Sequence, residues 1–362
     1  MARLGDYTNI KTGKLDANAS SDNGIYPFFT CSKEPLTIDT YSYNCECVLV
    51  AGNGDLNVKY YSGKFDAYQR TYIIESNNEE KLFVRYLYYF LDKYVETLRE
   101  QSIGGVIKYI KLGNLTEASI PLPPLDEQHK IAAVLDKVSN LIAKRRQQLD
   151  KLDEIVKSRF IEMFGDPVDN PHGFRKVALS ELAEIRIGPF GSLLHKEDYI
   201  EGGHPLLNPS HIVDGKVAPD SKLTISDKKY DELEAYHLHT GDVVMGRRGE
   251  MGRCAVVPSE GFLCGTGSLL IRTKGEVTAD YIQKTISFPS FRKTIEDMAV
   301  GQTMPNLNVP IVSKFQIIKP PIEVQKNYYK FVAQTDKSKL AIQKSLEKLE
   351  ILKKALMQKY FG

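Results

Sequence analysis

The chain has 362 residues, 42% of them hydrophobic, and a formal net charge of +2 at pH 7. A chain of this length and composition can bury more than one hydrophobic core, so we expect at least two domains. No apolar run is long enough to cross a membrane, the N-terminus shows no signal peptide, and the five cysteines form no C-x-x-C pair. We therefore expect no membrane partner, no disulfide framework and no zinc cage, and a location in the reducing cytoplasm.

The small net charge hides an uneven distribution. Residues 128–165 carry a net charge of +3 and residues 325–362 carry +6, which leaves −7 for the rest of the chain. A uniformly basic surface is therefore excluded for the remaining parts. Any nucleic-acid binding there must depend on local clusters, or on a partner protein that shares the phosphate contacts.

Residues 1–122 have the pattern of a β-rich domain that ends in a helix. Apolar runs predict strands at residues 26–30, 47–51, 58–62 and 71–75. The loop Gly52-Asn53-Gly54-Asp55 follows the second of these strands. An amphipathic helix is predicted over residues 82–99.

A long helix is predicted within residues 123–165. It follows Pro123-Pro124-Leu125-Asp126-Glu127-Gln128 and continues over residues 128–164 without a Gly or Pro. The acidic residues complement the positive end of a helix dipole, and the prolines limit where the helix begins. Steps of three and four residues collect an apolar stripe, which predicts a partner helix. The stripe contains Leu135, Val138, Ile142, Leu149, Leu152 and Val156.

Residues 166–319 repeat the plan of the first domain. Strands are predicted at residues 204–208, 242–245, 255–257 and 268–272, and one amphipathic helix at residues 279–298. The loop Gly246-Arg247-Arg248-Gly249 again follows the second strand. A second long helix is predicted over residues 325–361, within the segment 320–362. Its apolar stripe contains Val332, Ile342, Leu346, Leu349 and Leu356.

The chain is therefore a tandem repeat. The segment at Pro123 has its counterpart at Pro320, an offset of 197 residues, whereas residues 4–13 align with residues 179–188 at an offset of 175. The second copy is thus 22 residues longer. We predict an α+β fold, in which two β-rich domains are joined by two long coiled-coil helices with approximate internal two-fold symmetry. The helices should be antiparallel, because the first leads away from the first domain and the second begins at the second domain.

The sequence contains no recognisable catalytic constellation. It has neither a G-x-x-x-x-G-K-[ST] phosphate loop nor the [DN]-P-P-[YF] motif of amino-methyltransferases. His237 and His239 would share one face of a strand, but no third metal ligand stands at a suitable spacing, which favours a packing or surface role. We therefore expect a protein that is not an enzyme and that holds no metal or cofactor of its own.

Polar loops on the repeated scaffold supply the candidate binding residues. Arginine suits bidentate contacts with guanine or phosphate, and asparagine and glutamine suit adenine edges. The candidate DNA-binding residues are Asn53, Asn57, Lys59, Tyr60, Gln69 and Arg70 in the first copy and Arg247, Arg248, Arg253 and Thr266 in the second. Taken singly, each is better explained as an ordinary turn or surface residue. Binding is favoured because the two copies keep the scaffold and change the loop chemistry.

With these features the chain resembles the specificity subunits of type I restriction-modification systems over essentially its whole length. The resemblance is carried by two domains, each followed by a helix with a P-L-P-P-L-x-E-Q-type start, at residues 121–128 and, more degenerate, at residues 318–325. Residues 246–252 and 301–308 also match the family's patterns. Val324 departs from the type, because the family usually has Glu at that position.

The resemblance implies two target-recognition domains, each of which reads one half of a bipartite DNA target. It implies that the paired helices set the spacing between the half-sites and dock two methyltransferase subunits, with restriction subunits joining in the full complex. Adenine-N6 methylation and ATP-dependent cleavage, with S-adenosylmethionine, ATP and Mg, are assigned to those partners. Phosphate contacts from the methyltransferase subunits would also account for the net charge of −7.

Two alternatives from different functional classes stay open at this point. The chain could be a structural coiled-coil adaptor whose end domains bind proteins, and salt-dependent DNA binding in the presence of methyltransferase subunits would separate this from DNA recognition, because release of counterions from DNA makes such binding strongly dependent on salt. The chain could also be an enzyme in its own right, which isolated activity on DNA or a nucleotide would reveal.

Overall fold

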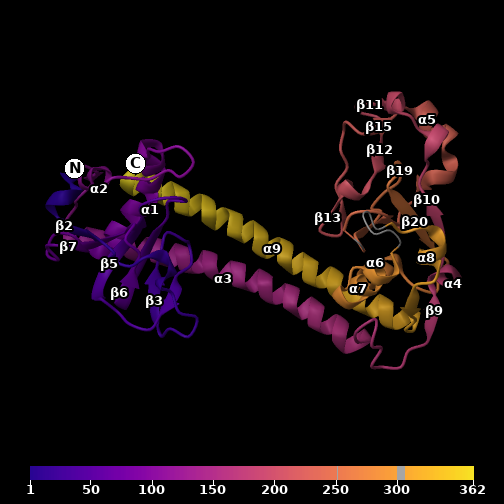
Figure 1. Cartoon of the computed structure of the whole chain (residues 1–362), viewed down its shortest axis with the longest axis horizontal. Coiled ribbons are helices and arrows are strands. Elements are labelled where there is room, and N and C mark those ends of the chain that lie inside the picture. Colours follow the sequence, from indigo (N-terminus) through magenta and orange to yellow (C-terminus); the bar gives the residue numbers. More distant parts are fainter. Residues whose placement is uncertain (251, 300–305) are drawn as a thin grey trace. The chain divides into compact units, whose positions relative to one another are not determined.

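The computed structural model describes residues 1–250, 252–299 and 306–362 (Figure 1). Met251 of the glycine-rich turn and residues 301–305 of the segment that resembles the family lie outside the described residues. The chain divides into two units, of which the first consists of residues 1–149 and 340–362 and the second of residues 150–339. No helix in the described ranges is both long and apolar enough to span a membrane.

A six-stranded sheet forms the frame of the first unit. Its strands are β2 (Thr8–Thr12), β3 (Tyr26–Phe29), β4 (Leu36–Ile38), β5 (Tyr43–Ala51), β6 (Val58–Ala67) and β7 (Thr71–Ser76). They lie in the order β2-β7-β5-β6-β3-β4, and only β3 and β6 are parallel neighbours. The four strands predicted for this domain are confirmed. β5 and β6 are longer than predicted because they pair as a hairpin from Tyr43–Phe65 to Val50–Val58.

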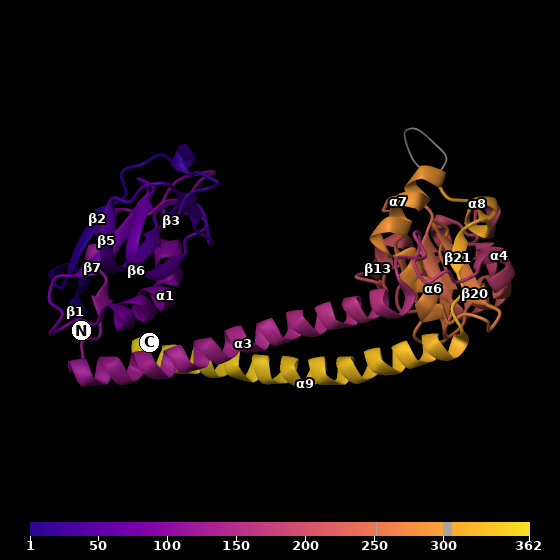
Figure 2. The same ribbon diagram turned by 90° about the horizontal axis from the view of Figure 1, so that it is seen from below.

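The second half of β5 is buried on both faces of the sheet, which explains its unbroken apolar run. Val48 and Val50 belong to the cluster that includes the apolar residues of α1 (Val84–Gln101). The next residues along the strand point to the other face, as the pleat requires. Figure 2 shows α1 on the side of the sheet where α3 begins. The second cluster contains Phe29, Cys47, Leu49, Phe65, Ala67 and Ile73.

The ends of two long helices complete the core of the first unit. These helices are α3 (Leu125–Phe164) and α9 (Ile322–Phe361), each of 40 residues. Leu135 near the start of α3 and Met357 near the end of α9 lie in the same buried cluster. The ring of Phe361 packs 5.1 Å from that of Tyr86, measured between centroids. The last turn of the chain is therefore part of the first core.

Two sheets form the frame of the second unit, in the orders β10-β20-β17-β18 and β11-β15-β12-β19-β16. The strands that correspond to those of the first unit are β10 (Ala183–Ile187), β12 (His204–Leu207), β17 (Val243–Gly246), β18 (Cys254–Val256), β19 (Phe262–Cys264) and β20 (Ser268–Thr273). β18 and β19 together replace the single long β6. Pro258 lies between them, and a proline cannot donate a hydrogen bond to a neighbouring strand.

Most of the extra length of the second copy lies between β12 and β17. This stretch adds short elements for which the first unit has no counterpart, namely β13 (Ile212–Val213), β14 (Lys216–Val217) and α5 (Asp227–Glu232), while β11 (Tyr199–Ile200) precedes β12. Two other strands of the stretch do have counterparts: β15 (Thr224–Ile225) pairs with β12 as β4 pairs with β3, and β16 (His237–Leu238) pairs with β19 as the start of β5 pairs with β6. The difference between the copies is therefore concentrated in one region.

The single helix predicted over residues 279–298 is wrong, because two helices occupy that stretch. They are α6 (Ala279–Ile286) and α7 (Pro289–Met298). Pro289 has no backbone N–H and clashes with the preceding turn, so it begins a new helix. Its counterpart in the first unit is Asp92, and α1 runs unbroken through that position. The predicted helix at residues 82–99 is confirmed, although it begins and ends two residues later.

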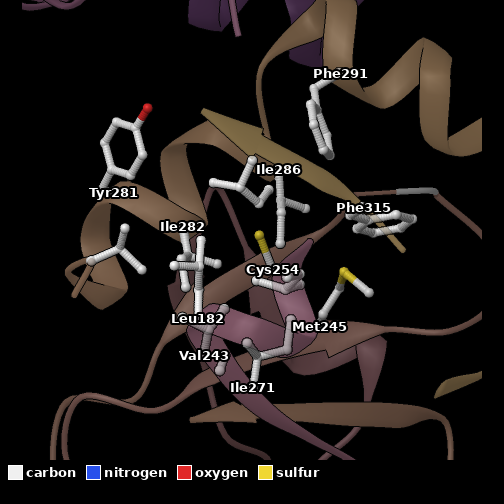
Figure 3. Packing of buried hydrophobic residues seen from close by; sticks show 14 of the residues in the cluster. Leu182, Val243, Met245, Cys254, Ile271, Tyr281, Ile282, Ile286, Phe291 and Phe315 are labelled. Atoms are coloured by element: carbon white, nitrogen blue, oxygen red, sulfur yellow. The ribbon is translucent and has the colours of Figure 1, made fainter. Parts of the chain in front are cut away.

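The second unit has a buried cluster that corresponds to the one beneath α1. Figure 3 shows Val243, Met245 and Ile271 of the sheet packed against Ile282 and Ile286 of α6. The end of α3 completes this cluster, because the ring of Phe164 lies 5.1 Å from that of Tyr281 and 5.4 Å from that of Tyr328, between centroids.

Strand register confirms the tandem repeat residue by residue. Thr8 pairs with Ser76 in the first unit, and Ala183 pairs with Thr273 in the second, at the offsets of 175 and 197 found in the sequence. The elements after the sheets keep the offset of 197, with α2 (Leu112–Thr116) matched by α8 (Val309–Ser313) and α3 matched by α9. Each unit also has a short two-stranded pair at the same place in the repeat. These pairs are β1 (Ala2–Arg3) with β8 (Ser119–Ile120) and β9 (Lys176–Ala178) with β21 (Gln316–Ile318). α4 (Leu179–Leu182) follows β9.

The long helices begin three residues earlier than predicted. α3 begins directly after Pro124 and α9 directly after Pro321. The first N–H groups of a helix have no partner within it, so a proline is tolerated there and its fixed φ suits the first turn. Glu127 N–H and Val324 N–H already donate to the carbonyl oxygens of these prolines, at 2.9 and 3.0 Å.

Within each unit the two helices pair in antiparallel fashion. In the first unit Arg146 Nη2 contacts Glu350 Oε1 at 2.7 Å, and in the second Lys339 Nζ contacts Asp153 Oδ1 at 2.6 Å. The members of the predicted apolar stripe are buried in the first half of α3 and half-buried elsewhere on the two helices. Exposed ion pairs contribute little stability, so we attribute the pairing to this stripe. The buried members are Leu135, Val138 and Ile142, and the half-buried ones are Leu149, Leu152, Val156, Val332, Ile342, Leu346, Leu349 and Leu356.

A buried glutamine fixes the start of each long helix to the domain that precedes it. Gln128 is fully buried, accepts from Phe83 N–H at 3.0 Å, and donates to the carbonyl oxygens of Lys81 and Pro123. Gln325, its counterpart, accepts from Thr278 N–H at 2.9 Å and donates to a proline carbonyl in the same way. These contacts explain why the repeated segment keeps a glutamine at this position.

We expect Gln128→Leu to destabilise the first unit by about 1–3 kcal/mol, because it leaves a buried N–H and two carbonyl groups without partners. Gln147→Leu is the matched control, since Gln147 is exposed on the same helix. Urea unfolding followed by circular dichroism measures both. Equal midpoints for the two variants would contradict the role assigned to Gln128.

A second comparison tests the helix seam. Ile142 is 8% exposed and its neighbour Leu141 is 37% exposed on the same helix. Ile142→Asp should lower the free energy of unfolding by at least the ~2–5 kcal/mol that removal of a buried aliphatic side chain costs. Leu141→Asp should have a small effect, because its charge stays in solvent. Thermal unfolding distinguishes the two variants, and similar losses would show that the seam has been misplaced.

Candidate nucleic-acid interface

Backbone hydrogen bonds bring the candidate loops of the first unit together at one edge of the sheet. The loop after β2 joins the loop before β7, because Gly13 N–H donates to Thr71 O at 3.1 Å. The loop after β5 joins the same region, because Gly52 N–H donates to Arg70 O at 2.8 Å. Gly52 O in turn accepts from Ile110 N–H at 2.9 Å. Four separate segments thus form one surface.

The second unit repeats this backbone frame. Gly188 N–H donates to Ser268 O at 3.1 Å, Arg247 N–H to Gly267 O at 2.9 Å, and Leu307 N–H to Arg247 O at 3.0 Å. These bonds match those of the first unit one by one. Equivalent backbone sites therefore carry different side chains, with Arg247 in the place of Gly52 and Gly267 in the place of Arg70.

Close backbone packing explains one glycine that both copies share. A Cβ atom at Gly13 would lie 2.1 Å from Ala67 O, and one at Gly188 would lie 2.0 Å from Gly265 O. Real Cβ atoms do not approach a carbonyl oxygen so closely, so only glycine fits this position. The frame depends on this contact, whereas the side chains around it are free to differ.

Three of the six candidates in the first unit lie on the shared surface. Asn53 is half-buried and its backbone bridges to Tyr109, while Gln69 and Arg70 are exposed. Gln69 Nε2 donates to Asp16 Oδ1 at 2.7 Å, and Arg70 has no acidic side chain within 4 Å among the residues described. These three side chains are available to a ligand.

The structure places the other three candidates in structural roles. Asn57 Nδ2 donates to Cys31 O at 2.8 Å, and Asn57 Oδ1 accepts from Lys59 Nζ. Burial lowers the pKa of the Lys59 amine. Tyr60 lies on the sheet face toward α1, where the Arg85 guanidinium is 4.4 Å from its ring centroid. Its hydroxyl donates to Glu46 at 2.7 Å, and burial with this bond raises the pKa of Tyr60 to about 12.

In the second unit two arginines and a threonine line one hollow. Arg247, Arg248 and Thr266 surround a space of about 400 Å³ together with Ile187, Phe190 and Gly267. Arg248 is exposed, whereas Arg247 is half-buried and its Nε donates to Leu307 O at 3.1 Å. Burial, followed by the adjacent Arg248 charge, lowers the pKa of Arg247. The hollow suits an anionic or hydrogen-bond-accepting ligand.

Arg253 is occupied by contacts within the protein. Its Nε donates to Glu250 Oε2 at 3.0 Å and its Nη1 to Pro209 O at 3.3 Å. Glu250 also accepts from Arg292 at 2.7 Å, and the bond from Arg253 is the main reason why the pKa of Glu250 is lowered. We therefore assign Arg253 to the support of the turn that carries Arg248.

Sequence reasoning missed two apolar groups on these surfaces. Phe190 is 61% exposed beside the two arginines, and Val106 and Ile107 are exposed at the tip of a loop in the first unit. The sequence signal for these apolar groups was the glycines beside them, which indicate loops. They are Gly188 and Gly191 near Phe190, and Gly104 and Gly105 before Val106. Within the described ranges no three His, Cys, Asp or Glu side chains form a group able to hold a metal ion.

Comparison with known proteins shows which family the two copies of this repeat match. The model of the type I restriction modification DNA specificity domain matches residues 1–154 and again residues 171–353. The EcoDI specificity subunit of Escherichia coli is 38% identical over 154 residues, which is 42% of this chain and 34% of that protein. The MjaVIII specificity subunit of Methanocaldococcus jannaschii is 21% identical and aligns with 99% of this chain and 90% of its own length.

Solved structures share the fold. The S subunit of the type I system of M. genitalium matches with a TM-score of 0.60 at 16% identity, covering 100% of this chain and 95% of that one. A chain from a structural study of complex assembly in a type I system matches with a TM-score of 0.61 at 17% identity, covering 99% and 96%. The two matched segments and the duplicated fold lead to one conclusion: this chain belongs to the family of type I restriction-modification specificity subunits, with two specificity domains in tandem.

Proposed function

We propose that this chain is the DNA-recognition subunit of a type I restriction-modification complex. Each specificity domain reads one half of a bipartite double-stranded target, through the surface built around Gly52 in the first unit and around Arg247 in the second. The two long helices set the spacing of the half-sites and dock two methyltransferase subunits. Restriction subunits join the full complex.

One observation carries this proposal. Equivalent backbone frames present different polar side chains, Asn53, Gln69 and Arg70 in one unit and Arg248 and Thr266 in the other. A constant frame with variable polar loops is what sequence-specific recognition requires, because base edges are read by hydrogen bonds from side chains that the backbone holds in place. A coiled-coil adaptor gives no reason for such a difference.

We assign the chemistry of the complex to its partners. Methylation of adenine N6 with S-adenosylmethionine, and cleavage driven by ATP with Mg, belong to the methyltransferase and restriction subunits under this proposal. Family membership supports the division, since the relatives reported above are named as specificity subunits. The chain itself supplies recognition and assembly, and needs no cofactor for either.

Methylome sequencing tests the proposal directly. Cells that carry this gene with its methyltransferase gene should methylate adenine in one bipartite motif, and cells without this gene should lose that methylation completely. The purified complex should bind the motif with an affinity that falls steeply as salt rises. Methylation that persists unchanged without the gene would refute the proposal.

Arg248→Ala should relax or weaken the half-site read by the second domain. Loss of one bidentate base contact costs about 1–3 kcal/mol, so methylation of the cognate motif should slow while related motifs gain. The half-site read by the first domain should stay the same. Arg175→Ala is the control, because Arg175 is exposed outside the surface. Equal relaxation of both half-sites would show that Arg248 contacts phosphate generally.

Helix length offers a test of the spacing role. α3 passes from the first unit into the second after Leu149, and the ion pairs Arg146–Glu350 and Lys339–Asp153 place Lys344 near the same level of α9. Four residues inserted after both Leu149 and Lys344 add about one turn, or roughly 6 Å. The unread gap should widen by one or two base pairs, each rising about 3.4 Å, with both half-sites kept.

The matched controls are the two single insertions. Each lengthens one helix alone, leaves its apolar stripe out of step with the partner, and should cost activity without a new defined gap. Methylome sequencing reads the gap in each variant. An active double-insertion variant that keeps the original gap would show that the helices do not set the spacing.

A further inference from the structure

A short hairpin in the first unit exposes two branched aliphatic side chains. Residues 103–109 form it, closed by Ile103 N–H to Tyr109 O at 3.0 Å and Tyr109 N–H to Ile103 O at 2.8 Å. At its tip Val106 is fully exposed and Ile107 is 63% exposed. The hairpin therefore holds two apolar groups out in solvent, although burying them would be favourable.

The hairpin is tied to the proposed DNA surface by its backbone. Gly54 N–H donates to Lys108 O at 2.9 Å, and Asn53 bridges to Tyr109. Lys108 directly follows Ile107 in the chain. The apolar tip thus lies next to the loop that carries Asn53, on the same edge of the sheet.

The charges around this edge favour a polyanion. Lys14, Arg70 and Lys108 have no acidic side chain within 4 Å in the part of the chain that the structure describes. The nearby Asp55 is already matched by two cations, Lys33 at 3.5 Å and Arg99 at 3.4 Å. An apolar tip with unmatched cations beside it fits nucleic acid better than an apolar protein surface.

The side chains on this surface match the major-groove edge of an A·T pair. Asparagine and glutamine can bond adenine N6 and N7, and the thymine of the same pair offers a C5-methyl group to an apolar side chain. We propose that Val106 and Ile107 contact thymine methyl groups in the half-site read by the first domain. This inference rests on the proposed function and adds to it a specific reader of A·T pairs.

Deoxyuridine provides the test, because it differs from thymidine only in lacking the C5-methyl group. Once the motif is known, each thymine of the two half-sites is replaced singly by deoxyuridine in a duplex, and binding by the complex with its methyltransferase subunits is measured. We expect replacement at one or two positions of the first half-site to weaken binding about fourfold, as loss of one buried methyl group predicts.

A double variant identifies the residues responsible. V106S/I107S should bind the all-thymine duplex more weakly by a similar factor, and should be insensitive to deoxyuridine at those same positions. V106I/I107V is the matched control, since it keeps two branched aliphatic side chains at the tip and should retain the sensitivity. Both variants should unfold like the wild type, because the tip is exposed.

Two results would overturn the inference. One is wild-type binding that ignores deoxyuridine at every position of the first half-site, and the other is a serine variant that keeps the wild-type sensitivity. Either can occur while the complex still binds its motif, so failure of this inference is distinct from failure of the proposed function, in which no motif is bound at all.

Discussion

The structure depends on an exchange of helix ends: the end of each long helix completes the hydrophobic core of the domain from the other repeat. The core of the first unit needs Met357 and Phe361 from the end of α9, and that of the second unit needs Phe160 and Phe164 from the end of α3. These are counterparts in the repeat, at the offset of 197. Neither domain can bury its helix-covered face with residues of its own copy alone. The antiparallel pairing of the helices follows from this constraint, and a single repeat would leave a large apolar surface exposed.

Most of the fold could be predicted from the sequence because it is set by local patterns and duplication. Apolar runs located the strands and heptad-like spacing located the long helices. Comparison of the two repeats located the ends of these elements within a few residues. The break before Pro289 was missed because the amphipathic pattern continues through it, whereas the rule that proline starts a helix would have found it. Tertiary pairing, which lengthens β5 and β6, has no comparable local pattern.

The candidate site could be predicted only in part, because the residue types in a loop do not reveal which side chains are engaged in contacts within the protein. Arg253 and Arg248 look alike in the sequence, yet Arg253 is held by Glu250 and Pro209 O while Arg248 is exposed. Tyr60 and Tyr61 are adjacent and face opposite sides of β6. Such distinctions depend on register and on distant partners, and neither is visible in one sequence.

Both units share a pair of residues joined by a backbone hydrogen bond, Gly52 with Arg70 in the first unit and Arg247 with Gly267 in the second. Each pair contains one arginine, but the arginine is the acceptor residue in the first unit and the donor residue in the second. In the first unit Arg70 faces Gly52, where a Cβ atom would come within 2.4 Å of Arg70 O. In the second unit the arginine is Arg247 and its partner is Gly267. Each domain thus carries an arginine at this pair, but on different segments, directly before β7 in the first unit and directly after β17 in the second. Two half-sites can then be read differently without any change in the scaffold that connects them, which is the property a modular recognition subunit requires.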